Sequence, residues 1–313
     1  MTNPIEVTFV SGKGGTGKTT LMASIATLSG EPVLADCDVD APDLNLVLEP
    51  EILHEESFSG GKTAVIDQEK CLLCGKCAAV CRFQAVVFCQ DDSGAPVYKV
   101  SEKDCEGCAV CARFCPAEAV SMIDRLDGNQ FVSETRLGPM AHAKLNPAAE
   151  TSGKLVTQVR KTASRMAEQT GRSPILIDGS PGIGCPVIAS LAGTDWAVIV
   201  VEPTASGFSD ARRIAQTASH FNTHCAICIN KYDINPEITD EIRQWAASEG
   251  IPILGRIPFD TAAVDAIFQH KTLVEMGETP AAASIRIVWK RLESLIATKQ
   301  QEIINLDYCS SRI

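Results

Sequence analysis

The feature that most constrains this chain is a glycine-rich run near its start, SGKGGTGKTT at Ser11–Thr20. The run fits the pattern G-x-x-x-x-G-K-[ST], and it lies between an apolar, β-branched segment at 5–10 and a segment at 18–28 that suits a helix. A chance glycine-rich turn is the alternative, and the flanking strand and helix argue against it. In such a unit, backbone N–H groups converge on phosphate oxygens at the helix N-terminus, where the dipole favours an anion.

The residues of this run have separate predicted roles in binding a nucleoside triphosphate. Lys18 is expected to reach the β- and γ-phosphates, and the Thr19 hydroxyl is expected to hold Mg²⁺. The remaining glycines and hydroxyl residues complete the loop. The predicted phosphate-binding residues are Gly12, Lys13, Gly14, Gly15, Thr16, Gly17, Lys18, Thr19 and Thr20.

Short apolar segments alternate with segments of helical length along much of the chain. This alternation is typical of a parallel sheet with right-handed crossovers, helices on both faces and ligands at the carboxyl ends of the strands. We therefore expect an α/β fold of the parallel-sheet P-loop NTPase class. The predicted strands are 5–10, 32–35, 174–177, 196–201, 225–229 and 251–257; the predicted helices are 18–28, 155–169, 209–220, one that follows Pro236, and 281–299; and 130–145 is a predicted hairpin centred on Gly138 and Pro139.

Nine of the 14 cysteines fall between Cys71 and Cys115, and eight of these nine form two runs of equal spacing. Each run reads C-x₂-C-x₂-C-x₃-C, the pattern of bacterial ferredoxins with two 4Fe–4S clusters, in which the fourth cysteine of each run binds the other cluster. Zinc is the alternative, but zinc sites usually separate two C-x₂-C pairs by a longer spacer. The predicted clusters are held by Cys71, Cys74, Cys77 and Cys115, and by Cys105, Cys108, Cys111 and Cys81.

The cysteine-rich stretch interrupts the α/β pattern and divides the chain into three segments. We expect 1–62 to be the first part of a P-loop ATPase domain, 63–124 an inserted α+β ferredoxin-like domain with two 4Fe–4S clusters, and 125–313 the second part of the ATPase domain. The first ten residues place Glu6 inside an apolar stretch and have no basic region, so no signal peptide is predicted. We expect a cytoplasmic protein, in which cysteines serve as metal ligands more often than in disulfides.

Lys13 gives the loop the form K-G-G-x-G-K-[ST]-T, which resembles the deviant P-loop of the MinD, ParA, Mrp and nitrogenase iron-protein family. The resemblance implies that Lys13 reaches across a nucleotide-sandwich dimer to the partner's phosphates, in the role of an arginine finger. A solvated loop lysine is the alternative. D-x-D at Asp36–Asp38 resembles the family's first switch, which implies that Asp38 orients the attacking water.

Two later segments also resemble motifs of this family. Ile175–Gly182, ILIDGSPG, resembles Walker B followed by the second switch. This resemblance implies that Asp178 contacts Mg²⁺ through water and that the Gly182 amide senses the γ-phosphate, whereas a helix cap is the alternative for a lone Asp at a strand end. N-K-Y-D, which begins at Asn230, resembles the segment with which the family recognises adenine through the Asn, and it also resembles the guanine-reading N-K-x-D motif of GTPases.

Over essentially its whole length the chain resembles MinD-superfamily ATPases that contain an inserted ferredoxin domain. The resemblance implies that the chain binds ATP and Mg²⁺, hydrolyses ATP, forms a homodimer on ATP binding, and couples this cycle to electron transfer or to metal-cofactor or iron–sulfur assembly with a redox or cofactor-client protein. One alternative is a MinD/ParA-type spatial-organisation switch with structural clusters; the tail, 303–313, lacks the basic amphipathic pattern with which MinD binds membranes. The other is a ferredoxin on a scaffold that never hydrolyses ATP, which the intact set of motifs disfavours.

Charge and one further cysteine complete the expectations. Lys and Arg number 28 against 39 Asp and Glu, a net charge of -11, and no apolar run approaches the length of a membrane span. We therefore expect neither nucleic acid nor membrane as a partner, because both need clustered basic residues or an apolar span. Cys185 lies in the second switch, from which the nitrogenase iron protein binds a bridging cluster, but that protein uses a second cysteine for which we find no counterpart; a structural role is the alternative.

Overall fold

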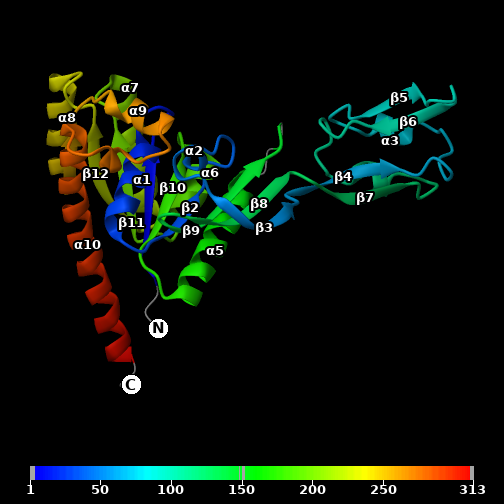
Figure 1. Ribbon diagram of the computed structural model, residues 1–313. Helices are drawn as coiled ribbons and strands as arrows, with labels where there is room; N and C mark the ends of the chain where they lie inside the picture. Colours follow the sequence, from blue (N-terminus) through cyan, green and yellow to red (C-terminus); the bar gives the residue numbers. More distant parts are fainter. Residues whose placement is uncertain (1–3, 148, 150–151, 311–313) are drawn as a thin grey trace. The chain divides into compact units, whose positions relative to one another are not determined.

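The computed structural model describes residues 4–147, 149 and 152–310, which form two compact units (Figure 1). The first unit comprises the described residues of Met1–Glu56, Gln130–Lys144 and Ser152–Ile313. The second comprises those of Ser57–Asn129 and Leu145–Thr151, so it interrupts the first along the chain. The predicted insert, 63–124, lies within the second unit.

The first unit is built on one large sheet. Its strand order among the described residues is β13-β12-β11-β1-β10-β2-β9-β8-β3, and the pairs from β13 to β9 are parallel. The central strands are almost completely buried because helices cover both faces. The strands are β1 (Glu6–Ser11), β2 (Val33–Asp36), β3 (Glu51–Phe58), β8 (Gly128–Thr135), β9 (Gly138–Leu145), β10 (Ile175–Pro181), β11 (Trp196–Val201), β12 (His224–Asn230) and β13 (Ile253–Ile257).

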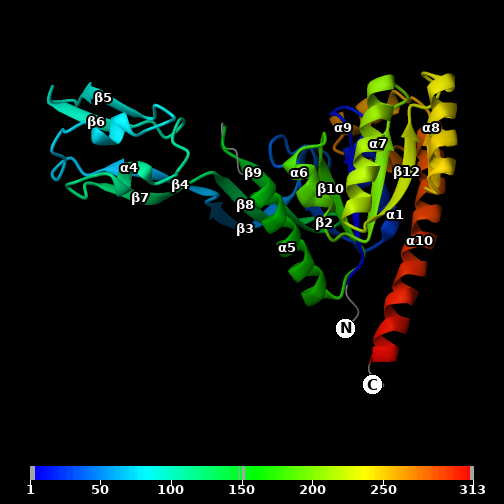
Figure 2. The same ribbon diagram turned by 180° about the vertical axis from the view of Figure 1, so that it is seen from behind.

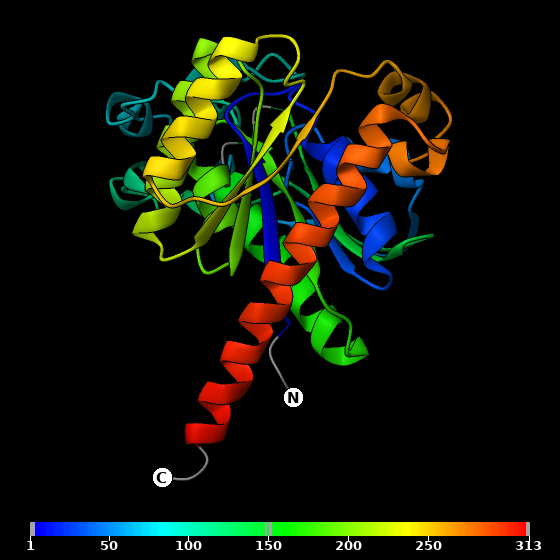
Figure 3. The ribbon, with the colours of Figure 1, turned by 90° about the vertical axis from the view of Figure 1, so that its left-hand side faces the viewer.

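The helices form a layer on each face of this sheet. Apolar residues of α1 and α10 pack with one face, and those of α6, α7 and α8 pack with the other, where α5 lies beside α6 (Figure 2). Figure 3 shows α10 running diagonally across its face of the sheet. The helices are α1 (Lys18–Ser29), α2 (Leu44–Leu48), α5 (Ser152–Thr170), α6 (Cys185–Leu191), α7 (Ala205–His220), α8 (Pro236–Ser248), α9 (Ala262–Phe268) and α10 (Pro280–Ser310), with a 3₁₀ turn, η1 (Leu273–Met276).

The predicted α/β fold is confirmed, and several of its details are corrected. The turn of the predicted hairpin lies at Arg136 and Leu137, directly before Gly138. The last helix continues to Ser310 instead of ending near Lys299, because extending a helix that is already packed on β13 costs little. Helices α2, α6 and α9 were not predicted, since five to seven residues are too few to show a helical period. No helix of the described residues is long and apolar enough to cross a membrane.

The second unit consists of two similar halves. Strand β4 (Gly61–Ile66) pairs with β7 (Val120–Arg125), and β5 (Val86–Gln90) pairs with β6 (Pro96–Val100), both antiparallel. A four-residue helix follows the second cysteine of each run, α3 (Lys76–Ala79) in the first and α4 (Val110–Arg113) in the second. Residues with positive φ recur at matching positions of the two runs: Leu73 and Gly107, Gly75 and Ala109, Gln84 and Glu118.

Candidate functional site

The glycine-rich loop joins the carboxyl end of β1 to the first turn of α1, at the edge of the sheet where a parallel α/β fold binds its ligands. Gly17 immediately precedes α1 with φ 84°, a left-handed conformation that favours glycine. At Gly12, an added Cβ would lie 2.1 Å from Asp210 Cβ on α7. These two glycines therefore allow the loop to turn sharply and to pass close to α7. Gly14 and Gly15 continue the loop, and Thr20 lies in the first turn of α1.

Lys18, Thr19 and Asp178 form a hydrogen-bonded group beneath this loop. Lys18 Nζ lies 2.7 Å from Asp178 Oδ1, and Thr19 Oγ1 donates to Asp178 Oδ2 at 2.6 Å. Burial acts to lower the pKa of Lys18, but the charge and hydrogen bond of Asp178 outweigh it and raise the pKa. The lysine is therefore held as a cation. Strand β10, which carries Asp178, is the neighbour of β1, so the strand order brings these residues together.

Asp36 is a member of the site that the sequence analysis did not single out. Because β2 pairs with β10, Asp36 lies in register beside Asp178, and both are buried. Burial and the neighbouring Asp178 raise the pKa of Asp36 well above its ordinary value. Its Oδ1 accepts a hydrogen bond from the Asp38 amide at 3.0 Å, whereas Oδ2 has no hydrogen-bond partner among the described residues. The first Asp of the D-x-D motif, at a strand end, was the signal that could have found it.

Asp38 lies close to the same group and is less deeply buried. Burial raises the pKa of Asp38 to about 6; the charge of Lys18 opposes this increase and that of Asp178 adds to it. Asp36, Asp38 and Asp178 supply carboxylate oxygens. Thr19 adds a hydroxyl oxygen, and Mg²⁺ prefers oxygen donors of both kinds. The buried, unpartnered oxygen of Asp36 fits a nearby cation. The donor set is therefore suited to Mg²⁺ beside a nucleotide.

Lys13 is bound by its own chain, at the segment that follows β11. Its Nζ lies 3.2 Å from Glu202 Oε2 and 3.4 Å from Thr204 Oγ1. Glu202 also binds Lys231 Nζ at 2.9 Å, and that ammonium donates to the Gly15 carbonyl at 3.1 Å. Burial acts against ionisation of Glu202, but these two lysines lower its pKa overall. Glu202, Thr204 and Lys231 follow the ends of β11 and β12, a position that could have marked them in the sequence.

The other predicted nucleotide residues lie around the loop. Asn230 Nδ2 donates to the carbonyl of Thr16 at 2.7 Å, so Asn230 supports the loop backbone, and its reading of adenine stays a prediction. The Gly182 amide donates to the Ser11 carbonyl at 2.8 Å, so contact of this amide with a γ-phosphate, which also stays a prediction, requires that bond to open. Cys185 is exposed at the first position of α6.

The eight cysteines of the second unit surround two separate cavities. Cys71, Cys74, Cys77 and Cys115 line the first, with Tyr98 in its wall. Cys81, Cys105, Cys108 and Cys111 line the second. In each cavity three cysteines of one run meet the fourth cysteine of the other run, because the two halves of the unit pack on each other. The two groups of four are those that the spacing predicts as ligand sets, and their binding of clusters stays a prediction.

The cysteines offer sulfur ligands with amide donors beside them. Cys81 Sγ accepts a hydrogen bond from the Ala85 amide, and Cys115 Sγ accepts one from the Ala119 amide, both at 3.3 Å. All cysteines whose side chains the structure describes are free thiols, and within the described residues no three His, Cys, Asp or Glu side chains are arranged to hold a single metal ion. A cubane spreads its four thiolates further apart than one ion does, because each binds a different iron. The donor set therefore fits a 4Fe–4S cluster.

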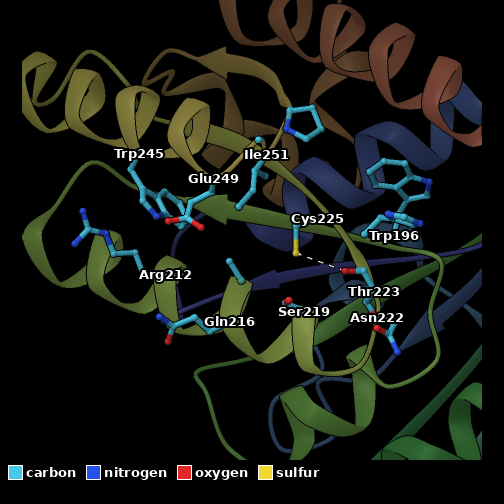
Figure 4. Close-up of a pocket in the computed structure, with 14 residues that line it drawn as sticks. Trp196, Arg212, Gln216, Ser219, Asn222, Thr223, Cys225, Trp245, Glu249 and Ile251 are labelled. Atoms are coloured by element: carbon cyan, nitrogen blue, oxygen red, sulfur yellow. Dashed lines mark hydrogen bonds between the residues drawn. The ribbon is translucent and has the colours of Figure 1, made fainter.

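A groove in the first unit lies at the opposite edge of the sheet, where the parallel strands begin. It measures about 1020 Å³ and lies where β11 and β12 begin, between the ends of α7 and α8 (Figure 4). Arg212 stacks over the Phe208 ring at 4.1 Å beside Trp245, and Cys225 faces the groove from β12. Cys228 packs on the opposite face of the sheet, as the strand period predicts for this C-x-x-C pair. This groove contains none of the predicted site residues.

Residues 7–274 match the family model of the CobQ/CobB/MinD/ParA nucleotide-binding domain. The uncharacterised protein MJ0578 of Methanocaldococcus jannaschii is 30% identical over 302 residues, which cover 93% of this chain and 98% of that protein.

Solved structures of similar fold include MinD of Pyrococcus horikoshii in complex with Mg-ADP, at a TM-score of 0.57, 17% identity, and coverage of 94% of this chain and 98% of that one. The cell division ATPase MinD of Pyrococcus furiosus gives a TM-score of 0.56 at 18% identity, with 93% of this chain and 99% of that one covered. At these identities the likeness concerns the fold. The family match spans most of the chain, and the chain belongs to the CobQ/CobB/MinD/ParA nucleotide-binding domain family.

Proposed function

We propose that this chain is a Mg²⁺-dependent ATPase that dimerises on ATP binding and couples its nucleotide cycle to two 4Fe–4S clusters in an inserted ferredoxin-like domain. The clusters serve electron transfer or the assembly of a metal cofactor or iron–sulfur centre on a client protein. The observation that carries the proposal is the grouping of eight cysteines into two sets of four, in a chain whose other unit has a P-loop site.

The ATPase part rests on the group beneath the loop. Lys18 is a buried cation beside Asp178, positioned to neutralise phosphate oxygens, and Thr19, Asp36 and Asp178 supply oxygen donors for Mg²⁺. Bound Mg²⁺ would neutralise charge on the β- and γ-phosphates. Asp38, ionised at neutral pH, would orient the attacking water. Lys13 would leave Glu202 to contact the phosphates of a second copy.

The redox part rests on the second unit. The two sets of thiolates would each hold one cluster, and the amides of Ala85 and Ala119 would donate to the sulfurs of Cys81 and Cys115. A 4Fe–4S cluster supplies one-electron transfer when bound. The chain's own contribution is to hold the thiolates, to surround them with apolar side chains and to place the second cysteine of each run at the surface, where Cys74 and Cys108 are exposed.

The decisive test is the metal content of anaerobically purified protein. We expect about eight iron atoms and eight acid-labile sulfides per chain, as two cubanes require. Cys77→Ala should remove about half of the iron. Cys89→Ala is the matched control, because Cys89 is a cysteine of the same unit that lines neither cavity, and it should keep all of the iron. Stoichiometric zinc without sulfide would overturn the cluster assignment.

A second measurement separates coupling from the spatial-switch alternative, in which the clusters are structural. The cluster potentials are measured with ADP and with a non-hydrolysable ATP analogue, in the wild type and in Lys13→Ala. Coupling predicts that the analogue shifts the potentials in the wild type alone, and linkage then requires the cluster oxidation state to change ATP affinity by the same factor. Equal potentials in all four samples would favour the switch.

A further inference from the structure

Thr63 is a buried polar residue on β4 without a structural partner. The residue is only 2% exposed, and its hydroxyl has no hydrogen-bond partner among the described residues. A buried hydroxyl without a partner costs about 1–3 kcal/mol, so such a group calls for an explanation. The strand pairs with β7 through backbone bonds, which leaves the Thr63 hydroxyl outside the ladder.

Cys105, the first cysteine of the second run, lies against this part of β4, since it lines one cavity with Ala64, the residue that follows Thr63. The groups that act on the Cys105 sulfur are the amides of Ala64 and Gly107, the Thr63 hydroxyl and the guanidinium of Arg125. Arg125 also fixes the loop, since its Nη1 donates to the Cys105 carbonyl at 3.2 Å. Cys105 is therefore held close to the part of β4 that carries Thr63.

A close backbone contact holds this loop against β4. Gly107 has φ 66°, and a Cβ added there would lie 2.3 Å from the Lys62 carbonyl oxygen, so only glycine permits this approach. The matching position of the first run is Leu73, which has a side chain. The first loop therefore cannot make the same contact with its own opposing strand.

The two halves of the unit also differ at the position of the hydroxyl. Cys71 and Cys105 occupy matching positions of the two halves. By the same sequence offset, Thr63 on β4 matches Val97 on β6. Val97 is buried like Thr63 but has no donor. The second run thus has a hydroxyl beside its first cysteine where the first run has a methyl group.

We infer that Thr63 is a positioning residue that donates a hydrogen bond to the Cys105 thiolate when that sulfur holds a cluster, and that it raises the potential of this cluster alone. The inference rests on the proposed function. A reduced cluster carries one more negative charge, so a donor on a ligand sulfur stabilises the reduced form more than the oxidised form. The two clusters consequently differ in potential in a way that the equal cysteine spacing does not reveal.

The test uses the full chain, purified anaerobically, with redox titration of both clusters followed by electron paramagnetic resonance. Thr63→Val keeps the shape and removes the donor, and it should lower one of the two midpoint potentials and leave the other unchanged. Thr63→Ser keeps the hydroxyl and removes only the methyl group, and it should keep both potentials near the wild-type values. Thr63→Ala provides a second variant without the donor, with the same expected shift as Thr63→Val.

Iron and sulfide are counted first in every sample, which separates two kinds of failure. Wild-type protein without clusters overturns the proposed function and this inference with it. Intact clusters with unchanged potentials in both donor-free variants overturn this inference and leave the proposed function standing. A shift in Thr63→Ser as large as that in Thr63→Val would assign the effect to packing and also overturn the inference.

Discussion

Lys13 Nζ lies 3.2 Å from Glu202 Oε2, so the lysine expected to act across a dimer is held by a carboxylate of its own chain. Any contact with a partner's phosphates must break this ion pair and the contact with Thr204. The side chain of Lys13 is 40% exposed, so solvent screens the pair and its breakage costs little. The Lys13–Glu202 ion pair therefore adds a small free-energy cost to dimerisation, which opposes the dimer when no nucleotide is bound.

We accordingly expect Glu202→Gln to promote the ATP-dependent dimer, lowering the protein concentration at half-dimerisation on the order of threefold. The measurement is sedimentation velocity over a concentration series with a non-hydrolysable ATP analogue. Asp240→Asn, which breaks the exposed Arg243–Asp240 pair on α8, serves as the control and should change nothing. A weaker dimer in Glu202→Gln would show that Glu202 acts in some other way.

Binding and turnover of ATP should separate between Lys18 and Asp38. Lys18→Ala should abolish nucleotide binding, because it removes the buried cation that faces the phosphates. Asp38→Ala should bind ATP with near-normal affinity and stop turnover, because Asp38 acts on the attacking water. Calorimetry and phosphate release are the measurements. Normal hydrolysis by Asp38→Ala would make the assignment of the first switch wrong.

The pKa of Asp38 predicts the acid limb of the rate profile. Burial raises this pKa to about 6, and the water-orienting role needs the ionised carboxylate. The ATPase rate should therefore be constant well above pH 6 and fall about tenfold per pH unit well below it. The measurement is kcat from pH 5 to 8 with saturating ATP and Mg²⁺. A flat profile through pH 6 would indicate that Asp38 is not the titrating group.

A different carboxylate should govern the acid stability of the first unit. Arg136 Nη2 lies 2.8 Å from Glu275 Oε2, and although burial opposes ionisation, Arg136 and Thr272 lower the pKa of Glu275 to about 2. A depressed pKa contributes stability above the unfolded-state value of about 4.3, and this contribution disappears as pH falls toward 2.

Glu275→Gln should therefore lower the free energy of unfolding by about 1 kcal/mol at pH 7, the usual contribution of a half-buried, charge-assisted pair. The difference from wild type should vanish as the pH approaches 2. Denaturant unfolding of the two proteins across this range is the measurement. Glu278→Gln breaks the longer and more exposed pair with Arg286, at 3.6 Å, and should have little effect at any pH.

Sequence reasoning reached the fold and much of the candidate site because those signals are local. The loop at Ser11–Thr20 is a continuous motif whose glycines and hydroxyls have fixed positions, and the two cysteine runs carry their spacing in the same way. Alternating apolar strands and helices imply a parallel sheet whatever the strand order. Asp178 was found because it follows the predicted strand 174–177 in a segment that resembles Walker B, although β10 itself continues to Pro181.

The tertiary structure decided which of these local signals meet. Asp36 joins the site only because β2 lies beside β10, and Lys13 reaches Glu202 only because β1 lies beside β11. No local sequence pattern predicts that β2 pairs with β10 or that β1 pairs with β11, because strand order depends on how the distant crossover segments pack. Likewise the strand that carries Thr63 meets the loop that carries Cys105 through the close approach of Gly107 to the Lys62 carbonyl, between segments far apart in the chain. Contiguous residues determine what a motif can bind. Long-range packing determines which side chains surround the motif and how they change the pKa values of its ionisable groups.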